Sequence, residues 1–383
     1  MLDTDALIIG AGPYGVATAH ALHARGLRPF VVGEPFALWH RHTLDGMRLR
    51  SDPRMSSIGP FDFQDWLRRR GLPWGAHERI RVEHFRDYLH EVVDGLPFPL
   101  HSGRVDHLAR VAEGDESAPP GARFVATTDD GTTVAARSVV IATGSGTHTH
   151  VPSSLRHLPP DRLLHSWDVE RIQVLDDARV LVVGAGQSAA ETVETLAPGN
   201  RVTWVLRHPV LFFREPLRAP TPIFKLLLAV SPALYKVPRT LRRALQSAFF
   251  RTTVTPDLRA VYQRGDVVKL FADADDLALR LDGDGRGDRG AIHCGLDERH
   301  YDAVVAATGF RYSLAGLPFL DSALARELGA LDAVPPLDDD FQTPVAGVYL
   351  AGGIAEGAFG PAQRFLLGSR YASQRIAGAI AAG

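Results

Sequence analysis

Cysteine is almost absent from this chain of 383 residues, in which Cys294 is the only example. One cysteine can form neither an internal disulfide nor a Cys-x-x-Cys redox pair, so enzymes that depend on such a pair are excluded. Lysine is also rare, and arginine supplies nearly all of the positive charge. Because the formal net charge is only −2, the composition gives no reason to expect a nucleic-acid partner.

Long apolar runs are missing as well. No uncharged apolar stretch is long enough to cross a bilayer, and the N-terminus runs directly into a strand-like segment that leaves no room for a signal peptide. We therefore expect a soluble, cytoplasmic protein. With 45% hydrophobic residues, the chain is large enough for two or three lobes.

Glycine, by contrast, is concentrated in informative places. The segment ALIIGAGPYGVATAHALH (residues 6–23) runs from an apolar strand through Gly10, Gly12 and Gly15 into a helix. In a dinucleotide-binding turn the first glycine permits the sharp turn, the second lets a pyrophosphate approach the backbone, and the third lets helix and strand pack closely. The N–H groups and dipole of the helix N-terminus favour the phosphate charge. An ordinary glycine-containing loop is the alternative.

The same signature occurs a second time, in VLVVGAGQSAAETVETLA (residues 180–197). Gly184 and Gly186 match the first two glycines, and Ala189 takes the place of the third, a variant that the fingerprint allows. The repeat predicts two dinucleotide sites in one chain.

The two copies differ at the end of the strand that follows each turn. After the first copy, RPFVVGE ends on Glu34, whose carboxylate can accept hydrogen bonds from ribose hydroxyls, which favours FAD or NAD. After the second copy, RVTWVLR ends on Arg207, whose guanidinium can pair with a 2′-phosphate, which favours NADP. Either residue alone could be an ordinary surface charge, but the contrast at matched positions supports both assignments.

Each glycine turn is also followed by its own strand that ends in Ala-Thr-Gly. The first is SVVIATGS (138–145) and the second is YDAVVAATGF (301–310). A later strand, GVYLAGG (347–353), and a final helix that begins at Pro361 complete the chain. Two lobes of the same architecture, one inserted into the other, explain this duplication.

The sequence thus predicts an α/β protein with two Rossmann-like, doubly wound parallel-sheet domains. An FAD-binding domain takes residues 1–155, an NADPH-binding domain is inserted at 156–312, and residues 313–383 return to the FAD domain.

Helices are expected near 61–67 and over 82–93. The loop WHRHTLDGMRLRS (39–51) is expected over the flavin, where Trp39 could stack and Arg48 could contact phosphate or flavin. The alternative for Trp39 is that it packs beneath the loop.

This arrangement resembles the two-dinucleotide-binding-domain flavoproteins over nearly the whole chain. Disulfide reductases of that group need the cysteine pair that is missing here. Ferredoxin- and rubredoxin-type reductases usually end the C-terminal strand in Gly-Asp, where this chain has Gly352-Gly353. The chain looks like the third branch, the class B flavin monooxygenases, whose NADPH turn is similar to GAGQSAAE (184–191).

The resemblance implies a function: NADPH would reduce FAD, and the reduced flavin would take up O₂ as a C4a-peroxyflavin that inserts one oxygen atom into a small organic substrate. The segment LLHSWD (163–168) lies where this branch carries a His/Trp fingerprint, but His165 and Trp167 are only one residue apart and no Phe-x-Gly precedes them. Baeyer–Villiger oxidation, N-hydroxylation, S-oxidation and C-hydroxylation therefore stay open. His165 can also be a structural linker histidine. The alternative function is an NAD(P)H-dependent flavoprotein reductase that passes electrons to a protein or small-molecule acceptor.

Cofactor residues follow from the motifs, whereas no catalytic residue and no metal ligand is assigned. Gln363, beside Pro361, is placed at the edge of the flavin, with a simple helix cap as the alternative. The predicted residues for FAD and NADPH are Gly10, Gly12, Pro13, Gly15, Glu34, Trp39, Arg48, Val105, Ala142, Thr143, Gly144, Gly184, Gly186, Gln187, Ser188, Ala189, Arg207, Thr308, Gly309, Gly352, Gly353 and Gln363.

The stretch from about 209 to 260 is basic, apolar and interrupted by prolines. It follows the second strand of the NADPH lobe, where an insertion would form a lid over an apolar or anionic substrate. A helical subdomain with solvated arginines and an interfacial helix on anionic lipid are the other interpretations, of which membrane contact is the least favoured.

Overall fold

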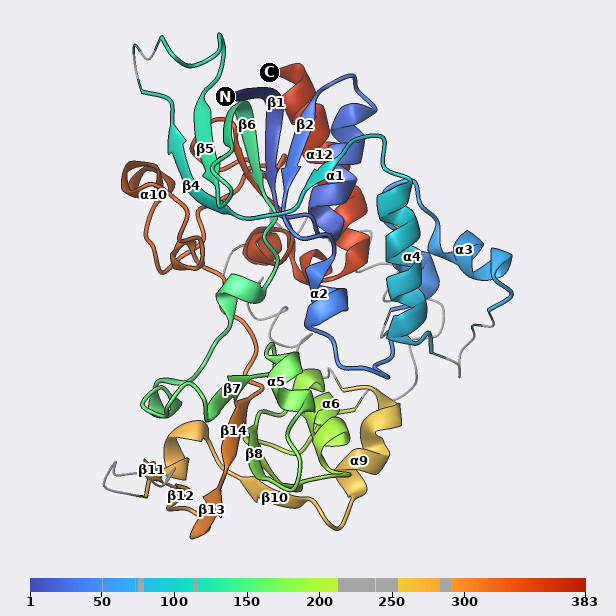
Figure 1. The fold of residues 1–383 in the computed structure, drawn as a ribbon, viewed down its shortest axis with the longest axis vertical. Coiled ribbons are helices and arrows are strands. Elements are labelled where there is room, and N and C mark those ends of the chain that lie inside the picture. Colours follow the sequence, from blue (N-terminus) through green and yellow to red (C-terminus); the bar gives the residue numbers. More distant parts are fainter. Residues whose placement is uncertain are drawn as a thin grey trace.

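The computed structural model describes residues 1–49, 51–72, 74, 79–112, 114, 116–212, 238, 254–282 and 291–383. These residues form two lobes, each built around a parallel β-sheet, and both ends of the chain lie in the first lobe (Figure 1). No helix in the described ranges is both long enough and apolar enough to cross a bilayer.

The first lobe is organised around a sheet with the order β3-β2-β1-β6-β5-β4, in which β15 lies beside β6. The strands β1, β2, β3, β6 and β15 run parallel, whereas β4 and β5 form an antiparallel extension. The carboxyl end of β1, where the glycine turn begins, is therefore flanked by β2 and β6. The bounds are β1 Leu2–Ile9, β2 Pro29–Val32, β3 Leu100–His101, β4 Val105–Arg110, β5 Phe124–Thr128, β6 Thr133–Ile141 and β15 Val348–Leu350.

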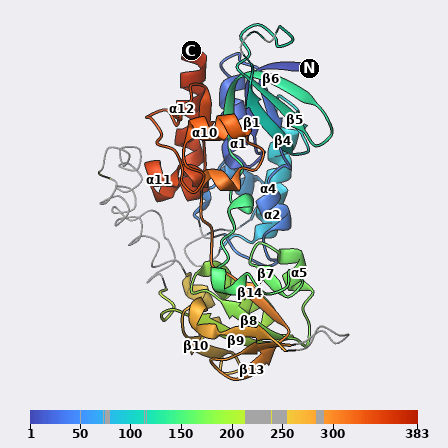
Figure 2. The same cartoon turned by 90° about the vertical axis from the view of Figure 1, so that its left-hand side faces the viewer.

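Helices cover this sheet and extend the lobe. The first and last helices, α1 and α12, pack side by side (Figure 2), and small buried residues such as Ala19 and Ala372 allow this approach. The helices α3 and α4 form a separate cap around Phe63, Phe85 and Tyr88. The bounds are α1 Pro13–His23, α2 Ala37–Arg41, α3 Phe63–Arg69, α4 Val82–Asp94, α10 Ser322–Leu328, α11 Glu356–Phe359 and α12 Leu366–Ala382.

The second lobe repeats the plan with the parallel order β10-β9-β8-β14-β7. One face of this sheet packs on α5, α6 and α9 around Trp204, and the other is covered by the antiparallel sheet β11-β12-β13 around Tyr301. The bounds are β7 Leu163–His165, β8 Arg179–Val183, β9 Arg201–Leu206, β10 Val268–Phe271, β11 Leu279–Leu281, β12 Ile292–Cys294, β13 Arg299–Tyr301, β14 Ala303–Ala306, α5 Val169–Gln173, α6 Gln187–Leu196 and α9 Arg259–Gln263.

The predicted α/β class with two Rossmann-like parallel sheets is confirmed, but several local predictions need correction. The strand expected at 138–145 begins earlier, because β6 continues the second strand of the preceding hairpin into the parallel sheet. The segment LLHSWD is not a linker, since its first residues form the edge strand β7 beside β14. The helices expected near 61–67 and over 82–93 are present as α3 and α4.

The final helix begins later than predicted. Pro361 opens a short 3₁₀ turn, η9 (Pro361–Arg364), and Phe365 is extended, so the α-helix starts only at Leu366. Most of the basic stretch expected at about 209–260 lies outside the described residues.

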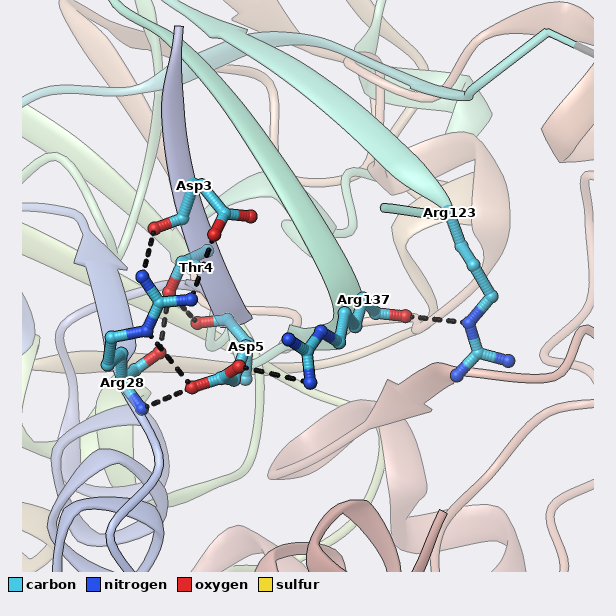
Figure 3. A network of polar contacts seen from close by, with 7 residues as sticks. Asp3, Thr4, Asp5, Arg28, Arg123 and Arg137 are labelled. Carbon is cyan, nitrogen blue, oxygen red and sulfur yellow. Dashed lines mark hydrogen bonds and ion pairs between the residues drawn. The ribbon is translucent and has the colours of Figure 1, made fainter. Parts of the chain in front are cut away.

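A polar network in the amino-terminal half of β1 ties this strand to the start of β2 (Figure 3). Asp5, which is 8% exposed, accepts hydrogen bonds from the backbone N–H of Arg28 at 2.8 Å and from its Nε at 3.3 Å. Nη1 of Arg137 lies 3.5 Å from the other carboxylate oxygen. Burial raises the pKa of Asp5, but the hydrogen bonds from Arg28 and the charges of Arg28 and Arg137 outweigh it and hold the pKa below 3.8.

Replacing Asp5 by alanine is expected to lower the free energy of unfolding by about 2 kcal/mol, because the partly buried amide of Arg28 loses a charged acceptor. Asp3→Ala is the matched control: Asp3 contacts the same guanidinium at 2.9 Å, but its side chain is 39% exposed, so the loss should stay below about 1 kcal/mol. Because the folded pKa is depressed, the Asp5 contribution exists above the unfolded pKa and disappears as the pH falls through the folded value. Urea unfolding at neutral and at acidic pH measures this, and equal losses in both variants would contradict it.

Candidate cofactor site

The first glycine turn joins the carboxyl end of β1 to α1. Gly10 has a φ of +115°, and a Cβ at this position would lie 2.3 Å from the carbonyl oxygen of Ala142, so only glycine fits. The amide of Gly10 donates to the carbonyl of Val32 at 2.7 Å, and the amide of Ala142 donates to that of Ile9 at 2.8 Å. The turn is therefore held between β2 and β6.

Gly12 and Gly15 have opposite surroundings. A Cβ at Gly15 would lie 1.8 Å from the carbonyl oxygen of Gly10, whereas a Cβ at Gly12, the N-cap of α1, would meet nothing within 4 Å. Packing therefore requires the third glycine, and the second leaves open space in front of the helix N-terminus. Pro13 in the first turn of α1 costs no hydrogen bond. An open backbone surface at a helix N-terminus is the cradle that a pyrophosphate needs.

The second turn repeats the geometry of the first. Gly184 has a φ of +145°, and its Cβ would lie 2.3 Å from the carbonyl oxygen of Ala307. Its amide donates to Val205 at 3.0 Å, and the amide of Ala307 donates to Val183 at 2.8 Å. Gly186 is the N-cap of α6, as Gly12 is of α1. The repeat seen in the sequence is thus a repeat of backbone contacts.

Glu34 stands beside the first turn. Gly33, which sequence reasoning did not single out, has a φ of +153°, and its Cβ would lie 2.6 Å from the amide nitrogen of Ala11. In the sequence, the glycine that stands between β2 and Glu34 is the feature that indicates this close approach of two backbone segments. The Glu34 side chain is 43% exposed and forms an ion pair with Arg41, which leaves the carboxylate at the solvent-exposed rim of the turn.

Arg207 occupies the matching place after β9. Its side chain is 74% exposed, and its Nε lies 3.8 Å from Oδ1 of Asp273. An ion pair that is this long and this exposed contributes little, so the guanidinium can be redirected to a phosphate at small cost.

Ser188 and Gln187 open helix α6 but differ in exposure. Ser188 is exposed in the first turn, where its hydroxyl can reach a ligand. Gln187 is buried: its Oε1 accepts from the amide of Thr255 at 3.0 Å, and its Nε2 donates to Glu191 at 2.7 Å. The Gln187 carboxamide therefore connects Thr255, near the end of the basic stretch, to α6. Ala189, in the place of the third glycine, is fully buried.

Gln363 is buried with an unpartnered oxygen. The residue is 2% exposed, and its Oε1 has no hydrogen-bond partner among the described residues. The Tyr14 hydroxyl donates to the carbonyl of Phe365 at 2.9 Å, so the start of α12 is fastened to the start of α1. A buried acceptor without a donor costs roughly 1–3 kcal/mol. An N–H group on a cofactor ring could donate a hydrogen bond to this oxygen. The residues present therefore fit a dinucleotide whose ring carries an N–H donor.

The other predicted residues lie in several parts of the two lobes. The Trp39 ring packs edge-on against Phe85 with 5.3 Å between centroids, Arg48 is exposed, and Val105 lies in the same buried cluster as Ile9 and Val32. The glycine-rich strand ends lie as follows: Thr143 and Gly144 after β6, Thr308 and Gly309 after β14, and Gly352 and Gly353 after β15.

His165 has the structural role that its sequence context left open. The residue is 5% exposed; its Nε2 donates to the carbonyl of Gly309 at 3.1 Å, and its Nδ1 accepts from the amide of Trp167 at 3.1 Å. Burial lowers the pKa of this imidazole. Both ring nitrogens form hydrogen bonds, so His165 connects β7 to Gly309, which follows β14 where the chain returns to the first lobe.

His148 is a buried histidine that the sequence did not reveal. It is 2% exposed, and neither ring nitrogen has a hydrogen-bond partner in the described structure. Burial lowers its pKa to about 4, so the imidazole is neutral in the folded protein at physiological pH.

His148→Leu is expected to flatten the pH dependence of stability between about pH 4 and pH 6.5. In this window the unfolded imidazole takes up a proton and the folded one does not, so wild-type stability falls as the pH falls, by about 3 kcal/mol in total. Urea unfolding across this range measures the slope. At neutral pH the variant should lie within about 1 kcal/mol of the wild type. Parallel stability curves for both proteins would show that His148 does not carry the effect.

Comparison with known proteins connects this geometry to a family. The family model for L-lysine 6-monooxygenase/L-ornithine 5-monooxygenase matches residues 74–254. An L-ornithine N(5)-monooxygenase of Burkholderia cepacia is 26% identical over 377 residues, covering 84% of this chain and 83% of that protein. The chain is therefore similar to lysine and ornithine monooxygenases, locally in the family model and along most of its length in the Burkholderia cepacia protein.

Two other matches differ in extent. The probable indole-3-pyruvate monooxygenase YUCCA9 of Arabidopsis thaliana is 30% identical over 205 residues, which is 51% of this chain but 45% of the plant protein. This chain therefore spans about half the length of that relative. The ornithine N-hydroxylase KtzI of Kutzneria sp. 744, solved with reduced FAD, NADP⁺ and L-ornithine, has a TM-score of 0.76 and 19% identity, with 99% of both chains covered. At this identity the likeness establishes the fold.

The cofactors predicted from the two turns agree with this family. The KtzI structure holds reduced FAD and NADP⁺ together in the same fold. These similarities agree with the predicted branch of the flavoproteins.

Proposed function

We propose that this protein is an NADPH-dependent flavin monooxygenase that transfers one oxygen atom from O₂ to the nitrogen of a small primary amine. The duplicated glycine turn carries the proposal, because it gives one chain two dinucleotide cradles. The amine is suggested by the relative that aligns along most of the chain, which is named as an L-ornithine N(5)-monooxygenase.

In this proposal the first lobe binds FAD. The N–H groups at the start of α1 and the open face of Gly12 receive the pyrophosphate. The Glu34 carboxylate accepts hydrogen bonds from ribose hydroxyls, and Oε1 of Gln363 accepts one from the flavin ring. When bound, FAD supplies the redox chemistry, taking a hydride from NADPH and passing electrons to O₂.

The second lobe binds NADPH in the same proposal. The start of α6, with the exposed Ser188, receives the pyrophosphate, and Arg207 pairs with the 2′-phosphate. The proposed domain limits stay at 1–155, 156–312 and 313–383; they are supported by the second parallel sheet, whose strands all lie between residues 163 and 306.

A flavoprotein reductase is the competing function. Cys294, the only cysteine, is fully buried, and burial raises the pKa of its thiol. A buried thiol of raised pKa is a poor redox nucleophile. A reductase of this sequence would therefore need an external electron acceptor.

The fate of O₂ separates the two functions. The holoenzyme is supplied with NADPH, O₂ and a panel of primary amines that includes L-ornithine and L-lysine. The proposal predicts that one amine accelerates NADPH oxidation and yields one hydroxylamine for each O₂ consumed. If every amine leaves hydrogen peroxide equal to the NADPH consumed, the monooxygenase function fails and a reductase takes its place.

A further inference from the structure

The loop after α2 contacts both lobes. In the first lobe it is held by α4, where Nη2 of Arg86 donates to the carbonyl oxygen of Thr43 at 2.9 Å, and further contacts of the loop lie in the second lobe. It runs from α2 down towards the second lobe in Figure 1. The His42 ring stacks on the Trp167 indole with 4.1 Å between centroids and 20° between planes. Its Nδ1 donates to the carbonyl oxygen of Trp167 at 2.9 Å. One histidine of the first lobe thus holds both the ring and the backbone of one tryptophan of the second.

Leu44, two residues further on, is inserted into the core of the second lobe. The residue is 8% exposed, and it belongs to the hydrophobic cluster whose other described members run from Leu164 to Ala307. Burying a leucine side chain stabilises a contact by roughly 1.5–3 kcal/mol. The buried Leu44 side chain therefore contributes strongly to the contact between the lobes.

Trp167 also touches both places where the chain crosses between lobes. A Cβ at Gly146, on the first crossing, would lie 2.9 Å from Cζ2 of the indole. The Phe310 ring, on the second crossing, stands edge-on with 5.8 Å between centroids and 85° between planes. The indole, two residues beyond the end of β7, is therefore bounded by the loop and by both crossings.

An ion pair near α6 adds to the contact between the lobes. Arg79 of the first lobe, whose side chain is 15% exposed, lies 3.0 Å from Asp257 of the second. Burial and the charge of Asp257 raise the pKa of Glu194 on α6, and the positive charge of Arg48 partly offsets this. Opposite charges thus face each other on the two sides of the lobe interface.

We infer that residues 42–48 and Trp167 form an interlobe clamp, which holds the nicotinamide-binding lobe in one orientation towards the flavin-binding lobe. His42 and Trp167 are positioning residues, since neither needs to touch a cofactor to act. A misplacement of about 1 Å between reacting groups can cost about a hundredfold in rate, and a clamp of stacking, hydrophobic and ionic contacts restricts such movement. The link to hydride transfer rests on the proposed function, whereas the clamp itself does not.

The first experiment measures the distance between the lobes without any chemistry. Spin labels are attached at Arg104→Cys in the first lobe and Val174→Cys in the second, where the native side chains are 80% and 78% exposed. Native Cys294 is buried and out of reach of the label. We expect one narrow distance distribution in the otherwise wild-type protein and a broadened or second distribution in His42→Ala. An unchanged distribution in His42→Ala would overturn the clamp.

The second experiment measures flavin reduction by NADPH in rapid anaerobic mixing. His42→Ala and Trp167→Ala should slow reduction at least about tenfold, with unchanged FAD content and with NADP⁺ affinity within about threefold, because the nucleotide contacts lie inside each lobe. Trp167→Phe, which keeps an aromatic ring for stacking, should restore most of the rate. His90→Ala is the matched control, since its ring contacts His40 within the first lobe at 4.7 Å.

The two experiments separate the clamp from its effect on hydride transfer. A broadened distance distribution with an unchanged rate of flavin reduction would overturn the positioning role. If NADPH fails to reduce the flavin of the wild type, the proposed function fails, while the distance measurement still decides the clamp.

Discussion

Gly12→Val is expected to give a folded protein that contains essentially no FAD. A side chain at Gly12 meets nothing within 4 Å, and the backbone there, with φ −83° and ψ −174°, is extended and suits valine. The fold therefore tolerates the change, but the new methyl groups occupy the space in front of the α1 N-terminus, where the pyrophosphate is expected. The absorbance of flavin relative to protein after purification with excess FAD measures the loss, and circular dichroism reports folding.

Two other glycines test whether the effect belongs to this place. A Cβ at Gly378 in α12 also meets nothing within 4 Å, so Gly378→Val should keep its flavin. A Cβ at Gly15 would lie 1.8 Å from a backbone carbonyl, so Gly15→Ala should fail to fold rather than lose only FAD. A yellow Gly12→Val protein with a full complement of flavin would remove the FAD assignment of the first turn.

Arg207→Ala should raise the KM for NADPH roughly tenfold and leave the KM for NADH nearly unchanged. Loss of a hydrogen-bonded contact to a charged group costs about 1.5–3 kcal/mol. Because the Arg207 side chain is 74% exposed, we expect the lower end of this range, which corresponds to about tenfold. The effect should shrink as ionic strength rises, since salt screens an exposed pair. Initial rates with both coenzymes at two salt concentrations measure it.

Arg201→Ala is the matched control at the other end of β9. The Arg201 side chain is 73% exposed and lies 3.3 Å from Asp177, so the variant loses a similar surface charge away from the expected nucleotide. It should affect neither coenzyme. Equal increases in both KM values for Arg207→Ala would mean that another residue recognises the 2′-phosphate.

The strand–turn–helix units were predictable because their signals are local. Gly10 and Gly184 carry positive φ angles in the same contact with the following Ala-Thr-Gly strand, and apolar runs directly before them are the buried strands β1 and β8. The same logic found α4, whose buried residues recur on one helical face.

The misplaced features have different physical causes. Proline suits the first turn of a 3₁₀ helix as well as that of an α-helix, and Phe365 then interrupts the helical backbone before α12. The sequence does not predict the short strand β7, because three residues carry too little periodicity to be recognised. Its pairing partner, β14, lies far away in the sequence.

The sequence by itself determined the two dinucleotide turns, the acid and the base that follow them, and the absence of a cysteine pair. Each of these depends on residues a few positions apart, where backbone geometry is dictated by the presence or absence of a Cβ. Only the tertiary structure decided that His42 stacks on a tryptophan 125 residues away and that Leu44 joins the second core. It also decided that the Gln363 side-chain oxygen and the His148 ring nitrogens are buried without hydrogen-bond partners in the described structure. These contacts form when helices and strands that are distant in the sequence pack against each other. The burial of one polar side chain in such a contact produces no recurring pattern in the sequence.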